Sequence, residues 1–115
     1  MARAYHRALL PQVLDDLRAL TRFDDRLIDA ALQAIVDLAE HRKTGKLLGS
    51  RHVSGDLSGC RRLRIDLAGE RPQRFRVIYR LLPDEDNADT VEVIAVGPRG
   101  GHAAYQSAVS RLTGS

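Results

Sequence analysis

The chain has 115 residues, the length of one domain with a single modest core, and we expect one domain over residues 1–115. Aromatic residues make up 4% of the chain and tryptophan is absent, so the core must be aliphatic. No apolar run approaches the roughly 20 residues of a membrane helix, the first ten residues are too polar for a signal peptide, and one cysteine excludes an intrachain disulfide. No Cys/His cluster has zinc spacing. We therefore expect a cytoplasmic protein without membrane segment, metal or cofactor.

The net charge of +3 conceals a concentration of cations in the middle of the chain. Residues 42–80 hold eleven basic and three acidic side chains, whereas residues 1–41 hold five and seven, and residues 81–115 hold two and five. Most of the central cations are arginines, whose planar guanidinium binds phosphate in a fork. Such a distribution is typical of phosphate binding, although a solvated basic face has the same composition.

The first part of the chain predicts a short strand followed by two helices. Residues 4–10 can form the strand, and Pro11 suits the first turn of a helix that continues to Leu20. Asp24 can cap a second helix, in which apolar residues recur with helical period as far as Ala39. We expect these helices to form an antiparallel hairpin that packs on a sheet.

The second part predicts a loop, three strands and a last helix. Residues 45–59 are rich in glycine and serine and favour a loop. Strands are expected at 60–67, 73–82 and 90–97, and a short helix at 103–112. The expected fold is α+β: the helical hairpin packed on a small, mainly antiparallel sheet of three or four strands, with a short C-terminal helix. The strand residues expected to face the core are Leu63, Ile65, Leu67, Phe75, Val77, Tyr79, Val91, Val93 and Ala95.

Arginines recur at alternating positions in two of these strands. Because residues i and i+2 of a strand point to one face, Arg62 and Arg64 should share a face, as should Arg74, Arg76 and Arg80. The pattern predicts a sheet with one apolar face and one guanidinium-bearing face that is at least partly open. Such a face suits an anionic polymer.

Several motifs occur in a specific order. The Gly-X-Leu-X-Gly stretch Gly55–Gly59 precedes an Arg-X-Arg strand, a Phe-Arg-Val-Ile-Tyr strand, and a strand ending Val-Gly-Pro-Arg before a tyrosine-bearing helix. With the N-terminal helical hairpin, this order resembles the RelE/ParE superfamily, the toxins of bacterial type II toxin–antitoxin pairs. The resemblance covers nearly the whole chain and is strongest over residues 55–112.

The resemblance implies a catalytic set. RelE-like members cut messenger RNA in the ribosomal A site, whereas ParE-like members poison DNA gyrase and lack the catalytic side chains. The RelE pattern has basic residues where this chain has Arg62, Arg64, Arg76 and Arg99, and a tyrosine where it has Tyr105. All five positions hold a suitable residue, which favours the nuclease branch. Arg74, Arg80 and His102 are expected to contact RNA beside this set.

One departure from the RelE pattern concerns proton transfer. The pair at Arg62 and Arg64 is commonly lysine, which can act as a base, whereas arginine stays protonated because its pKa lies above about 12. Tyr105 or His102 would then be the better base, although His102 can equally be an exposed loop histidine.

The resemblance thus implies a metal-independent endoribonuclease toxin that acts on the ribosome and mRNA and forms a hetero-oligomer with a cognate antitoxin. A gyrase inhibitor and a catalytically inactive RNA-binding relative are the alternatives.

Overall fold

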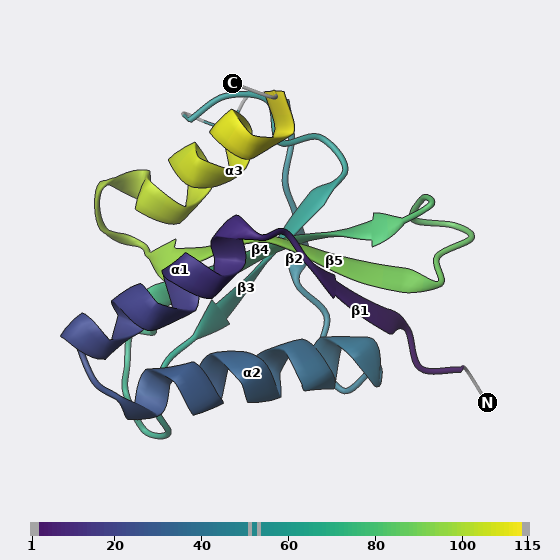
Figure 1. Ribbon diagram of the computed structural model, residues 1–115. Coiled ribbons are helices and arrows are strands. Elements are labelled where there is room, and N and C mark those ends of the chain that lie inside the picture. Colours follow the sequence, from purple (N-terminus) through teal and green to yellow (C-terminus); the bar gives the residue numbers. More distant parts are fainter. Residues whose placement is uncertain (1–2, 51, 53, 114–115) are drawn as a thin grey trace.

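The computed structural model describes residues 3–50, 52 and 54–113, and within these residues five strands form a single sheet with the order β1-β5-β4-β3-β2 (Figure 1). The strands are β1 His6–Leu9, β2 Lys46–Leu47, β3 Cys60–Ile65, β4 Phe75–Leu82 and β5 Thr90–Pro98. Successive strands from β2 to β5 pair antiparallel, and β1 adds to β5 in parallel.

Two helices cover one face of the sheet. Helix α1 spans Gln12–Ala19 and continues into the short 3-10 helix η1, Leu20–Arg22; helix α2 spans Arg26–Ala39. The Asp24 carboxylate accepts the backbone N–H of Arg26 at 2.9 Å, but the N-cap position of α2 is held by Asp25, so the expectation that Asp24 caps this helix is wrong by one residue. The apolar sides of both helices pack on the sheet face that bears Ile65, Phe75, Val77, Tyr79, Val91 and Val93.

The last helix packs on the opposite face. The 3-10 helix η2, Gly100–His102, leads into α3, Ala103–Thr113, and Figure 1 shows α2 and α3 on opposite sides of the sheet. Ala104, Tyr105 and Ala108 of α3 form a second, smaller core with the sheet and the loop before β3. The strands and the loop contribute the other buried residues of this second core, which are Leu57, Cys60, Ile78, Ile94 and Ala95.

A β-bulge in β5 decides which face receives its side chains. Ile78 pairs with Ala95 whereas the next residue, Tyr79, pairs with Val93, so Ile94 is the extra residue. Ile94 and Ala95 therefore both turn toward α3. The expectation that Ala95 shares a core face with Val91 and Val93 is wrong, because simple alternation does not survive the extra residue.

The α+β fold class is confirmed, with one correction to the number of strands. The sheet has five strands in the described residues, where three or four were expected, because β2 forms inside the glycine-rich loop and β1 joins β5. The arginine-bearing face is partly covered by α3, which divides it into two ends. No helix in the described residues is long and apolar enough to cross a membrane.

Helix α3 is joined to α1 by an ion pair across the end of the sheet. Arg111 donates to both carboxylate oxygens of Asp16, at 2.6 and 2.9 Å, and to the carbonyl of Ile94 at 2.9 Å. Asp16 also accepts the N–H of Val96 at 3.0 Å. The contacts fix α3 over the sheet, and with it the position of Tyr105.

Candidate functional site

Three of the predicted arginines lie together on the sheet face that carries α3. Arg64 of β3 stands directly opposite Arg76 of β4, and Arg62 stands opposite Ile78. Directly opposed residues of an antiparallel pair share a face, so the three side chains emerge side by side. Strand alternation predicted this arrangement for Arg62 and Arg64.

Arg99 joins this group from the far end of β5. Its backbone N–H donates to the carbonyl of Arg74 at 2.8 Å, which holds the chain just beyond the strand against the β3–β4 hairpin. The side chains of Arg64, Arg76 and Arg99 line one hollow of about 380 Å³, together with Arg71, Pro72 and Gln73. A second hollow of about 460 Å³ is lined by Arg62, Arg64, Lys46 and Gln73, among others. We refer to Arg62, Arg64, Arg76 and Arg99 as the arginine surface.

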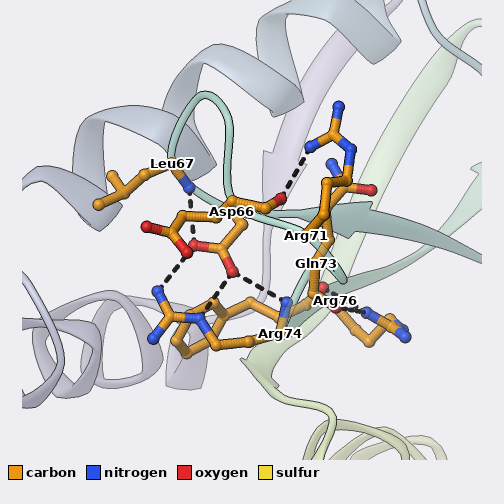
Figure 2. Close-up of polar contacts among 8 residues, drawn as sticks. Asp66, Leu67, Arg71, Gln73, Arg74 and Arg76 are labelled. Carbon is orange, nitrogen blue, oxygen red and sulfur yellow. Dashed lines mark hydrogen bonds and ion pairs between the residues drawn. The ribbon is translucent and has the colours of Figure 1, made fainter.

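Arg76 is the most unusual member of the arginine surface, because it is 5% exposed. Its Nη1 donates to the carbonyls of Gln73 and Phe75 at 3.0 and 2.9 Å. Its Nε is buried and has no hydrogen-bond partner among the described residues. In Figure 2 the Arg76 guanidinium points away from Asp66, on the side opposite to Arg74. A buried cation without a counter-ion is costly, and an anion bound beside it would lower that cost.

The other strand and helix arginines differ because carboxylates neutralise them. The ion pairs are Arg61–Glu85, Arg74–Asp66, Arg80–Glu92 and Arg111–Asp16. Within the residues that the structure describes, no carboxylate lies within ion-pair distance of any member of the arginine surface. The positive charge of this surface is therefore uncompensated and available to a ligand.

The electrostatics of Arg62 reflect this crowding of cations. Burial lowers the pKa of Arg62, and the nearby charges of Arg64 and, to a smaller extent, Arg76 lower that pKa further. Tyr105 raises the pKa of Arg62, which means that its phenol lies within electrostatic range of the guanidinium. An anion bound here would relieve the mutual repulsion.

Tyr105 lies beneath the surface and is stacked on His52, a loop histidine that had no place in the predicted site. Tyr105 is 6% exposed, and its ring lies 4.4 Å from that of His52, with 24° between the planes. His102 completes an aromatic group, with its ring 5.8 Å from His52 and 6.1 Å from Tyr105. His52 comes from the loop before β3, whose packing on α3 has no periodic signal in the sequence.

Arg74 lies elsewhere than predicted. It precedes β4, which begins at Phe75, so alternation does not extend to it. Its guanidinium forms a two-pronged ion pair with Asp66, at 2.8 and 2.9 Å (Figure 2). The same guanidinium lies over the Phe75 ring. These bonds, with the N–H groups of Arg74 and Leu67, lower the pKa of Asp66 to about 2. The expectation that Arg74 shares a face with Arg76 is wrong, since its charge is directed to Asp66.

Arg80 is separated from the arginine surface. It does share the α3 face, because it stands opposite Cys60, but Ile78 and α3 lie between it and Arg76. Its Nε donates to Glu92 at 2.6 Å.

Two residues that the sequence did not single out lie beside Arg64 and Arg76 instead. They are Arg71 and Gln73. The described residues contain no group of three or more His, Cys, Asp and Glu side chains arranged to hold a metal ion.

Comparison with known proteins shows the family of this chain. A family model described as the ParE toxin of the type II toxin–antitoxin system parDE matches residues 8–102. The chain belongs to this family. It is thus a toxin of a type II toxin–antitoxin system, and the resemblance to the RelE/ParE superfamily is confirmed. Comparison with curated protein sequences finds no match.

Two solved structures share the fold. One is a double arginine-to-alanine variant of the E. coli toxin RelE in the free state, 21% identical, with a TM-score of 0.63 over 95% of this chain and 98% of that chain. The other belongs to the toxin–antitoxin complex RelBE2 of Mycobacterium tuberculosis, 22% identical, with a TM-score of 0.59 over 86% and 95% of the two chains. At these identities the likeness establishes the fold of the ParE-family chain.

Proposed function

We propose that this toxin is a ribosome-dependent endoribonuclease that cuts mRNA and so stops translation. The observation that supports the proposal most is Arg76: a buried guanidinium that has no counter-ion among residues 3–50, 52 and 54–113 and lines a hollow together with Arg64 and Arg99. Cations fixed before the reaction stabilise negative charge as it develops on a phosphate, and they need no reorganisation at that moment.

The proposed reaction uses the 2′-hydroxyl of the substrate as its nucleophile. The 2′-oxygen loses its proton to a base and forms a bond to the adjacent phosphorus, and the bond from phosphorus to the 5′-oxygen breaks. A cyclic phosphate results, and the 5′-oxygen takes a proton from water to become a 5′-hydroxyl. Arg76 and Arg64 face the phosphorane oxygens, and Arg99 neutralises the leaving oxygen. Arg62 binds a flanking phosphate. Because the nucleophile is internal and the guanidinium groups supply the positive charge, the proposed scheme requires no metal ion.

Proton transfer in this scheme is assigned to His102. Arg62 and Arg64 remain protonated and cannot take the proton of the 2′-hydroxyl. Tyr105 is buried and one face of its ring is covered by His52, so it supports the site from beneath. His102 is exposed at the end of η2, three residues after Arg99, where it can exchange a proton with substrate and solvent. A base of this kind contributes roughly 10²- to 10⁴-fold to the rate.

The partners follow from the same proposal. The substrate complex is the ribosome with its mRNA, and the uncompensated arginine surface is the face that meets RNA. The solved RelBE2 structure is a toxin–antitoxin complex. For this chain we propose a cytoplasmic hetero-oligomer with a cognate antitoxin, whose acidic side chains neutralise the arginine surface or which displaces α3.

A gyrase inhibitor is the second candidate, favoured by the description of the matching family. Two assays on the purified protein separate the candidates: primer extension on mRNA bound to programmed ribosomes, and supercoiling of relaxed plasmid by gyrase. The proposal predicts cleavage in the first assay and no effect in the second. Gyrase inhibition without cleavage would establish the second candidate, and inactivity in both, with RNA binding retained, would identify a catalytically inactive relative.

A further inference from the structure

The group formed by His52, Tyr105 and His102 suggests a second part of the RNA site. Tyr105 is nearly buried under His52, whose ring is parallel to it within 24° at a centroid distance of 4.4 Å. His52 itself is half-buried, and one face of its ring rests on Tyr105. A planar ring supported from below is the arrangement by which proteins stack unpaired nucleobases.

The loop that bears His52 is packed against α3. Leu57 is fully buried in the core beneath α3, and the Leu48 N–H donates to the Cys60 carbonyl at 2.8 Å. Gly55 has a φ of +132°, and a Cβ at this position would lie 3.0 Å from a methyl group of Val109 in α3. Only glycine fits both the backbone angle and the contact, and this close approach brings the loop, with His52, over Tyr105.

The hydrogen bonding of His52 makes it a stacking surface and a poor base. Its Nδ1 accepts the backbone N–H of Ser54 at 3.0 Å, so this nitrogen carries no proton and the neutral ring bears its proton on Nε2. Burial lowers the pKa of His52, and the charge of His102 lowers it further. The hydrogen bond to Nδ1 also favours the neutral ring. The ring is therefore neutral at pH 7, with its basic nitrogen occupied.

The neighbourhood of Tyr105 indicates which ligand would reach this ring. Tyr105 lies within electrostatic range of Arg62, a member of the arginine surface. A single-stranded nucleotide carries a phosphate and a planar base a short distance apart. The arginine surface can bind the phosphate through a guanidinium, and the His52 ring can stack on the base. We propose that His52, supported by Tyr105, stacks on a nucleobase of the RNA strand whose phosphates bind the arginine surface. The inference rests on the proposed function.

The test compares two substitutions of His52. His52→Asn removes the ring but keeps an oxygen that can accept the Ser54 N–H, so the turn is retained; His52→Phe keeps a ring and removes the acceptor. The probes are a fluorescent 2′-O-methyl RNA tetranucleotide and the same backbone without bases, measured by fluorescence anisotropy. We expect His52→Asn to weaken binding of the first probe by roughly 5- to 100-fold, the range for loss of one stacked base, and to leave the second unchanged. His52→Phe should bind both probes nearly as the parent protein does.

The controls distinguish failure of this inference from failure of the proposed function. Arg62→Ala should weaken binding of both probes and reduce its salt dependence, whereas His52→Asn should leave the salt dependence unchanged. If Arg62→Ala weakens binding and His52→Asn does not, or if Asn and Phe at this position behave alike, the stacking role is overturned and the proposed function stands. If neither Arg62→Ala nor His52→Asn alters binding of either probe, RNA does not bind the arginine surface and both proposals fail.

Discussion

The ion pair between Asp66 and Arg74 should make a defined contribution to stability that disappears in acid. The Asp66 side chain is fully buried and accepts the N–H of Leu67, the N–H of Arg74 and two guanidinium N–H groups of Arg74. These bonds lower the pKa of Asp66 from its ordinary 3.8 to about 2. Because the folded-state pKa is depressed, the stabilisation is complete well above pH 3.8 and is lost as the pH falls through 2.

The magnitude follows from the size of the shift. A difference of nearly two pKa units corresponds to about 2 kcal/mol of folding free energy at pH 7. We therefore expect Asp66→Asn to lower the free energy of unfolding by about 2 kcal/mol at pH 7, and the gap from the parent protein to narrow between pH 5 and pH 2. Asp24, whose pKa is also about 2 because of its bonds with Arg26, titrates in the same window, so only the difference between the two proteins isolates Asp66.

The assay is urea denaturation at a series of pH values, followed by circular dichroism. Asp15→Asn is the matched control, because Asp15 is 81% exposed and lies 3.6 Å from Arg18. An exposed pair of this kind contributes at most about 0.5 kcal/mol, so its substitution should have little effect at any pH. A gap between Asp66→Asn and the parent that is the same at pH 7 and pH 2.5 would refute the electrostatic reasoning, as would a gap no larger than that of the control.

Three further outcomes are expected. Arg76→Met should raise the free energy of unfolding by about 1 kcal/mol in urea denaturation, because it removes a buried, uncompensated cation, and it should abolish cleavage. A loss of stability would show that the charge is neutralised in the free protein. Arg111→Ala should lower the free energy of unfolding by about 2 kcal/mol, since it leaves the largely buried Asp16 carboxylate without its ion-pair partner. The exposed control Arg18→Ala should lower it by less than about 0.5 kcal/mol, and equal effects of the two substitutions would contradict this. Arg62→Ala should reduce the slope of log affinity for RNA against log salt by about 0.7, and an unchanged slope would mean that Arg62 contacts no phosphate.

Local pattern in the sequence predicted most of the helices and strands and the shared face of Arg62 and Arg64, whereas the rest of the candidate site came from the resemblance to a family. Helical period predicted α1 and α2, and strand alternation placed Arg62 and Arg64 on one face. The same alternation failed at two points. Arg74 lies before the start of β4 and turns to Asp66, while the bulge at Ile94 reverses the side of Ala95.

The remaining differences depend on contacts between distant segments. Strand β1 has weak alternation and forms because β5 offers it a parallel edge, and β2 is two residues long within a glycine-rich stretch. The position of His52 depends on how its loop packs against Val109 of α3, which no local spacing reveals. In the part of the chain that the structure describes, the lack of counter-ions around the arginine surface likewise depends on which carboxylates the fold brings to the other arginines.

The central claim is that Arg76 stabilises the transition state of mRNA cleavage, and single-turnover cleavage at saturating enzyme tests it most directly. Purified parent protein, Arg76→Ala and the charge-matched control Arg18→Ala are each mixed with programmed ribosomes, and the cleaved mRNA is followed by primer extension. Loss of one preorganised donor costs at least about 10²-fold in the chemical step, so Arg76→Ala should cleave at least about 100-fold more slowly while Arg18→Ala cleaves at the parent rate. Equal rates for Arg76→Ala and the parent, or no cleavage by the parent itself, would contradict the account.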